Sequence, residues 1–284
     1  LNFDIVPGYI FNQGKIEGSS KQAISQRCSI VNINRKQSFA LRSSQRLRWL
    51  TKERGCIFEH LLTHNVPDDF DYVRNGIPNL GGEKDAKLFD ALESSRLRVS
   101  SLITKRPNDK VTTLHVFKAI RYFIHADRSL LGRKGIELHP RTDHAHRLLY
   151  VLLNSNIFYW YWRVLGGDQG LSYNFVKAAP VVELPLEQLN EAYSRLVKAE
   201  QECRVFKLNA GKEIPNVNFN IRQDLLIKND EMMIKHLGLP STFVEVPFYS
   251  KWPSLTERGL NDCHIKKYNV KHHPRRVLPS LDWA

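Results

Sequence analysis

Cysteine is scarce in this sequence, and the few that occur are not arranged in pairs. Cys28, Cys56, Cys203 and Cys263 are widely spaced single residues in a chain of 284. This spacing argues against a disulfide framework and indicates a reducing compartment. We therefore expect a cytoplasmic protein.

Long apolar runs are also missing. The longest candidate is interrupted at 154–156 and ends at Arg163, so no eighteen consecutive residues are apolar. We expect no membrane span. The chain begins with Leu1 rather than methionine, and no basic and apolar leader follows it. This start predicts a fragment or a processed product rather than a secreted precursor.

Acidic residues are few relative to basic ones. Lysine and arginine number 42 against 29 aspartates and glutamates, which gives a net charge of +13. Hydrophobic residues at 42% and aromatic residues at 10% are typical of a folded globular chain. A basic globular chain predicts a polyanionic partner, most commonly nucleic acid. The alternative is that the charge serves only solubility and non-specific association.

The most apolar stretch of the chain, residues 148–166, shows the spacing of a helix. Its apolar residues recur every three or four positions, which predicts one helix with a wide apolar face. Thr142 or Asp143 is expected to cap its start. The polar residues 154–156 lie in the middle of this helix, where they are better tolerated if their side chains have hydrogen-bond partners. We assign the aromatic side chains after them to the core rather than to base stacking.

The flanking segments predict both strands and helices. Residues 28–34 favour a strand, and 96–106 suggests a half-buried strand with a basic exposed face. Residues 110–127 mix β-branched and aromatic residues and favour strands, with a helix as the alternative. Residues 83–94 favour a short helix.

The last third of the chain is predicted to be mainly helical. Amphipathic helices are expected at 186–205 and 221–237, the second ended by Gly238, with a loop at 209–220 between them. Prolines bound the apolar segment 179–185 and favour an extended or edge strand there.

Two motifs in the middle of the chain carry a family resemblance. The sequence Val151-Leu-Leu-Asn-Ser-Asn-Ile-Phe-Tyr-Trp-Tyr-Trp162, with the proline-bounded segment Val181–Pro185 downstream, resembles the C-terminal specificity region of Taq-type adenine DNA methyltransferases and of type IIG restriction-modification enzymes. Upstream, Ile77–Leu92 is similar to an isoleucine-proline segment plus short helix in those regions, and Arg121–Ile124 to their arginine-tyrosine strand.

The resemblance implies a fold and a division of the chain. It implies an α+β protein, with a mixed sheet-and-helix DNA-recognition domain at 41–185 and a helical C-terminal extension with a basic tail at 186–284. Residues 1–40 would be a strand segment, similar to the end of a preceding methyltransferase domain. The implied function is sequence-specific recognition of double-stranded DNA.

The catalytic motifs of that family are absent from this sequence. Methylation of a flipped base there uses a loop with two adjacent prolines, and this chain has no such pair. It also lacks a glycine-rich strand-to-helix turn of the kind that holds S-adenosylmethionine. We therefore expect no catalytic residue and no cofactor in this chain. The resemblance places S-adenosylmethionine on a methyltransferase catalytic domain, in cis or in trans.

DNA recognition of this kind uses cationic side chains for phosphates and a few arginine, asparagine or glutamine side chains for base edges. The loop at 127–135 is a candidate for reaching a groove, although a plain solvated loop is an equal alternative. The candidate DNA-binding residues are Arg96, Arg98, Lys105, Arg106, Arg121, Arg128, Arg133, Lys134, Asn174 and Lys177.

Two alternative functions remain open. A metal-dependent nuclease needs clustered carboxylates and a lysine, for which Asp68, Asp85 and Lys87 are candidates, although the last two lie in a predicted helix. A non-specific basic scaffold would bind nucleic acid without sequence preference and with a steep dependence on salt.

Metal ligation is weakly indicated. Cys56, His60 and His64 are spaced four apart, but no fourth zinc ligand follows, and Cys263-His264 with His272-His273 is weaker still. Three further histidines near the central helix are more typical of caps or phosphate contacts than of general bases, namely His139, His144 and His146. We predict no metal site.

Overall fold

A computed structural model describes residues 2–10, 26–34, 40–44, 63–66, 77–118, 123–129, 135–165, 170–209 and 212–249. The chain divides into two compact units, Leu1–Ala86 with Trp252–Ala284, and Lys87–Lys251. Both strands and helices occur, so the predicted α+β class is confirmed. The domain boundaries predicted at residues 40 and 185 stay a prediction.

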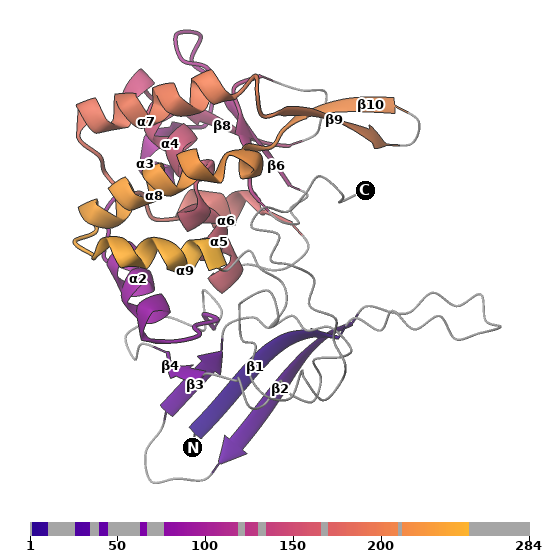
Figure 1. Ribbon diagram of the computed structural model, residues 1–284, viewed down its shortest axis with the longest axis vertical. Helices are drawn as coiled ribbons and strands as arrows, with labels where there is room; N and C mark the ends of the chain where they lie inside the picture. The colour runs from indigo at the N-terminus through magenta and orange to yellow at the C-terminus, as the bar shows by residue number, and fades with distance from the viewer. Residues whose placement is uncertain are drawn as a thin grey trace, which may run out of the picture. The chain divides into compact units, whose positions relative to one another are not determined.

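The first unit contains a four-stranded sheet in the order β2-β1-β3-β4 (Figure 1). Strand β1 (Asn2–Ile10) pairs antiparallel with β2 (Gln26–Asn34) and parallel with β3 (Ala40–Ser44), and β3 pairs antiparallel with β4 (Thr63–Asn65). The strand predicted at 28–34 is therefore confirmed.

A buried hydroxyl ties the sheet of the first unit to the segment that follows it. Ser43 Oγ donates to Pro78 O and accepts from Leu80 N at 3.3 Å. Ser43 and Leu80 are both inaccessible to solvent, so these bonds satisfy backbone groups that water does not reach.

The second unit contains an antiparallel sheet in the order β5-β8-β6-β7. The strands are β5 (Ile103–Thr104), β6 (Leu114–Phe117), β7 (Ala126–Asp127) and β8 (Gly135–Pro140). A Cβ atom on Gly135 would lie 2.8 Å from Val116 O, so the close pairing of β8 with β6 requires glycine at that position. Strands β6 and β7 confirm the strand prediction for part of 110–127. Residues 123–125, which include the end of the segment compared with an arginine-tyrosine strand, are not in a strand, and residues 119–122 lie outside the described ranges.

The single strand predicted at 96–106 is wrong. Helix α3 (Val99–Leu102) occupies its middle, and only two residues of it form β5. Val99 N donates to Ala179 O at 3.0 Å, and Val181 N donates to Leu97 O at 2.9 Å. These bonds to a segment some eighty residues away set the local conformation, which the short basic-apolar alternation could not.

The single helix predicted at 148–166 is also wrong, because the structure contains two. Helix α4 (Asp143–Leu153) ends at Asn154, and α5 (Asn156–Leu165) begins after Ser155. Ser155 Oγ accepts from Phe158 N at 3.0 Å, as the N-cap of a new helix does. The predicted cap at Thr142 is confirmed, since its hydroxyl accepts from Ala145 N at 3.1 Å.

Helices α4 and α5 form the centre of the core. The residues from Leu148 to Trp162 are all buried. Tyr159, Trp160 and Trp162 are buried, as the prediction that the aromatic residues belong to the core requires. Five further helices share this core or flank it, namely α2 (Glu83–Glu93), α6 (Tyr173–Ala178), α7 (Leu186–Ala199), α8 (Gln223–His236) and α9 (Glu245–Tyr249).

The last part of the second unit combines helices with a hairpin. The two predicted helices are confirmed as α7 and α8, except that residues 204–205, predicted as the end of the first helix, are in a strand. The chain leaves α8 through Gly238 at φ 73°, a conformation that favours glycine. Short 3₁₀ helices η2 (Phe219–Arg222) and η3 (Ser241–Val244) flank α8.

The loop predicted at 209–220 is wrong, because β9 (Arg204–Asn209) pairs there with β10 (Lys212–Val217). Proline is disfavoured inside a sheet, but a two-stranded hairpin leaves one edge of each strand free and so tolerates Pro215. Among the described helices, none is long and apolar enough to cross a membrane.

Candidate nucleic-acid interface

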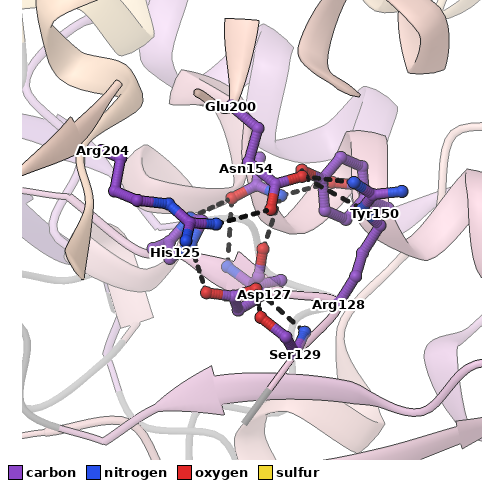
Figure 2. Close-up of polar contacts among 9 residues, drawn as sticks. His125, Asp127, Arg128, Ser129, Tyr150, Asn154, Glu200 and Arg204 are labelled. Carbon is purple, nitrogen blue, oxygen red and sulfur yellow. Dashed lines mark hydrogen bonds and ion pairs between the residues drawn. The ribbon is translucent and has the colours of Figure 1, made fainter. Parts of the chain in front are cut away.

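The break between α4 and α5 places an amide against the open edge of the second sheet. Asn154 Oδ1 accepts from Ala126 N at 3.0 Å, and its Nδ2 donates to Ala126 O at 3.1 Å and to Tyr150 O at 2.9 Å. Strand β7 is the last strand of its sheet, so the amide bonds the two backbone groups that a further strand would bond. Figure 2 shows this arrangement, and Asn154 is only 3% exposed.

Asn154 also fixes the tautomer of a buried histidine. Its Oδ1 pairs with His125 Nδ1 at 2.9 Å, and because this oxygen only accepts, Nδ1 must carry the hydrogen. His125 Nε2 then faces Asp127 Oδ2 at 3.6 Å, and neither atom has a hydrogen-bond partner.

Asp127 is held as a carboxylate. Its Oδ1 accepts from Ser129 N at 2.9 Å and from Ser129 Oγ at 3.0 Å. Burial raises the pKa of Asp127, but His125 and the two bonds from Ser129 lower it by more, so it lies below its ordinary value.

A second carboxylate joins two arginines and a tyrosine. Glu200, at the end of α7, accepts at Oε2 from Arg128 Nε at 3.1 Å and Nη2 at 2.6 Å, and from the Tyr150 hydroxyl at 3.4 Å. Arg204 Nη2 lies 3.9 Å from its Oε1. Burial lowers the pKa of Arg128, but its bond and charge pairing with Glu200 raise it by more.

These side chains come from β7 and the residues on either side of it, from α4, from the C-caps of α4 and α7, and from β9 (Figure 2). We call them the polar cluster: His125, Asp127, Arg128, Tyr150, Asn154, Glu200 and Arg204. The Glu200 carboxylate lies at the C-terminus of α7, where a negative charge is unfavourable. Arg128 and Arg204 offset that charge. The polar cluster therefore ties the edge of the sheet to three other elements.

The described residues give no support to the alternative zinc and nuclease sites. The described part of the chain contains no group of three or more His, Cys, Asp or Glu side chains able to hold a metal ion. Asp85 Oδ2 accepts from Gly81 N at 3.0 Å at the start of α2, which is a capping contact. Lys87 lies in α2 and His64 in β4. The other residues of the alternative sites lie outside the described ranges, namely Asp68, Cys56, His60, Cys263, His264, His272 and His273.

Two of the three histidines near α4 have structural partners. His139 Nδ1 is 3.1 Å from Thr113 Oγ1, and His146 Nδ1 donates to Thr112 O at 2.9 Å. The pKa of His146 is lowered, first by burial and then by the charge of Arg128, although the bond to Thr112 opposes this. His144 is exposed.

Two of the ten candidate DNA-binding residues have acidic partners. Arg98 Nη2 donates to Glu93 Oε2 at 3.2 Å and to Glu93 O at 2.9 Å, and Arg128 binds Glu200. These contacts give both arginines a role in holding the fold. Three more candidates lie outside the described residues, namely Arg121, Arg133 and Lys134.

The other five candidates are exposed, and their backbones converge on α3. Arg96 comes just before the helix, and Lys105 and Arg106 come just after β5. The bond from Val99 N to Ala179 O brings in the end of α6, which carries Asn174 and Lys177. The structure thus gathers basic residues from two distant segments around one short helix.

One further exposed basic residue near α3, Arg141, was not among the candidates predicted from the sequence. Arg141 N donates to Leu102 O and Arg141 Nε to Ser101 O, both at 2.9 Å, while its side chain is exposed. Only the pairing of β5 with β8 brings Arg141 to α3, and no local pattern predicts that pairing. We call the exposed group the α3 basic surface: Arg96, Lys105, Arg106, Arg141 and Lys177.

The fold places the chain in the α+β class, and the α3 basic surface is its main exposed cluster of candidate DNA-binding residues. No protein-family model, curated protein or solved structure matches it.

The lowered pKa of His146 predicts a pH effect on stability. A folded-state pKa below the ordinary 6.5 means that the unfolded chain binds this proton more readily. We expect the stability of the wild type relative to a His146→Gln variant to be greatest above pH 7 and to fall as pH drops through about 6.5. Thermal unfolding of both proteins between pH 8 and pH 5 measures it. His144→Gln, at an exposed position, is the control, and a difference independent of pH would contradict the prediction.

Proposed function

We propose that this chain binds double-stranded DNA in a sequence-specific manner, as the specificity part of an adenine DNA methyltransferase or type IIG restriction-modification enzyme. The observation that carries the proposal is the α3 basic surface, in which exposed cations from separate segments meet. Charges placed in this way match a phosphate backbone, and the net charge of +13 favours the same partner.

The family resemblance supports the proposal through residues with a defined structural role. Its most specific motif, Val151–Trp162, spans the break between α4 and α5. Within it, Asn154 bonds the edge of β7, and Ser155 caps α5. Both residues serve the architecture that presents the basic surface.

The proposal assigns the chemistry of methylation to another domain. S-adenosylmethionine and the catalytic residues would belong to a methyltransferase domain, in cis or in trans, which acts on the site that this chain selects. A cytoplasmic location fits such a partner and the wide spacing of the cysteines in the sequence. Of these cysteines, Cys203 is buried, and burial raises its pKa to about 11, which makes its thiol unreactive.

Selection of bound duplexes from a random DNA pool tests the proposed function. At about physiological salt we expect enrichment of one motif of several base pairs, with each mismatch costing about 1–3 kcal/mol. Binding without enrichment, with an affinity that falls steeply with salt, would favour the non-specific scaffold instead. No retained duplex would refute DNA binding by this chain.

A further inference from the structure

One face of α6 fixes this helix to the core. Val176 is inaccessible to solvent. The Phe175 ring packs against Phe158 and Tyr161, with ring centroids 6.3 Å and 5.6 Å apart. The Ser172 hydroxyl caps the helix by accepting from Phe175 N at 3.1 Å. The outer side chains of α6 are therefore mounted on a fixed support.

The outer face of α6 presents three kinds of side chain together. Tyr173, Asn174 and Lys177 are exposed, and Lys177 follows the other two by four and three residues, so it lies beside both on the helix surface. The Tyr173 residue is 42% exposed. No residue of α6 is acidic. The face thus combines an aromatic ring, an amide and a cation, without a negative charge that DNA would repel.

Segments with exposed cations are bound to both ends of α6. Just before the helix, Leu171 N donates to Lys118 O at 2.9 Å, and Lys118 is exposed. Just after it, Ala179 O accepts from Val99 N, which joins the helix to α3 and its basic surface. A helix of six residues is about 9 Å long, and the major groove is roughly 12 Å wide. Cations at the two ends of α6 therefore suit the phosphates on either side of a groove that the helix enters.

We infer that α6 enters the major groove of the DNA site and that Asn174 hydrogen-bonds an adenine there, with the Tyr173 ring against the paired thymine. This inference rests on the proposed function and deepens it, because it names a recognised base pair. The amide of asparagine matches adenine, since its Nδ2 donates to the ring nitrogen in the major groove and its Oδ1 accepts from the exocyclic amine. Thymine exposes a methyl group in the same groove, which apolar side chains contact. Lys177 is assigned to a phosphate, a contact that specifies no base.

Base analogues in the DNA and single substitutions in α6 test the inference. Duplexes are first selected from a random pool with the wild-type chain, and the enriched motif is expected to contain adenine. The wild type should bind about tenfold more weakly when carbon replaces the major-groove ring nitrogen of that adenine. Asn174→Ala should lose about the same affinity, show no preference for adenine at that one position, and be insensitive to the analogue. Replacing the paired thymine by deoxyuridine should weaken the wild type but not Tyr173→Ala.

Two further variants are the controls. Lys177→Ala should weaken binding to all duplexes alike and make the slope of log affinity against log salt less steep by about 0.9. Gln201→Ala removes an exposed amide that is not part of α6 and should leave both affinity and base preference unchanged. Circular dichroism and thermal unfolding verify that each variant is folded.

The outcomes separate the role of α6 from the proposed function. If the wild type enriches a motif, but Asn174→Ala retains its affinity and base preference or the motif contains no adenine, the assignment of Asn174 is overturned while specific DNA binding stands. If Asn174→Ala weakens binding to all duplexes equally, α6 contacts phosphates only and the inference fails. If the wild type enriches no motif, the proposed function fails first, and the inference that rests on it fails with it.

Discussion

Replacing Asn154 with alanine is expected to lower the free energy of unfolding of the second unit by about 3–5 kcal/mol. The change removes the bonds to Ala126 N, Ala126 O and Tyr150 O, and it leaves the backbone groups of β7 buried without partners. The His125 imidazole loses its partner at Nδ1 as well. Urea unfolding measures the loss, and hydrogen exchange of peptides covering 123–129 and 143–165 should show faster opening at this junction.

Two controls separate this role from a general effect of asparagine. Asn174→Ala, at an exposed position of α6, should change stability by about 0.5 kcal/mol or less. Asn154→Asp preserves the shape but removes the Nδ2 donor and adds a charge near Asp127 and Glu200. It should therefore be at least as unstable as the alanine variant. A loss below about 1 kcal/mol in both Asn154 variants would show that the amide does not hold the sheet edge.

Charge reversal on the α3 basic surface is expected to weaken DNA binding by two orders of magnitude or more. The variant replaces Arg96, Lys105, Arg106 and Lys177 with glutamate, all at exposed positions. The plot of log affinity against log salt has a negative slope, and each lost phosphate contact should make that slope less steep by about 0.9. Fluorescence anisotropy with a labelled duplex at several salt concentrations measures both quantities.

The control for this variant shows whether the loss depends on where the substituted residues lie or only on the change in net charge. Glutamate substitutions at four exposed lysines elsewhere in the second unit give the same net charge, and suitable positions are Lys110, Lys198, Lys228 and Lys235. We expect these to reduce affinity by less than about tenfold, through the long-range field alone. Equal losses in both variants would mean that DNA responds to overall charge and not to the α3 basic surface.

The sequence predicted the elements that depend on local patterns. The capping hydroxyl of Thr142 lies next to a strongly apolar periodicity, and Gly238 follows a helical repeat, so the limits of these helices could be predicted from nearby residues. Burial of the aromatic residues after Asn156 also followed from their density, because so much apolar surface on one helix needs cover. Five of the ten candidate DNA-binding residues are exposed, as phosphate contacts must be.

Other features depend on contacts between distant segments. The pattern at 96–106 alternates like a strand, but its bonds to 179–181 make it a helical turn. Arg128 resembles any basic loop residue in sequence, and only the arrival of Glu200, 72 residues later, gives it an acidic partner. Nothing in the sequence around Asn154 indicates that its side chain bonds a sheet edge as well as interrupting a helix. Such pairings cost chain entropy and form only when the whole unit packs.

The sequence by itself determined that this is a basic α+β protein with a central apolar helical region, because composition and periodicity act through neighbouring residues. The tertiary structure decided that the region is two helices joined by a polar break, and that Arg96, Arg141 and Lys177 meet around α3. It also decided that 204–209 and 212–217 pair as antiparallel strands. These outcomes depend on long-range hydrogen bonds and burial, which a linear pattern does not encode.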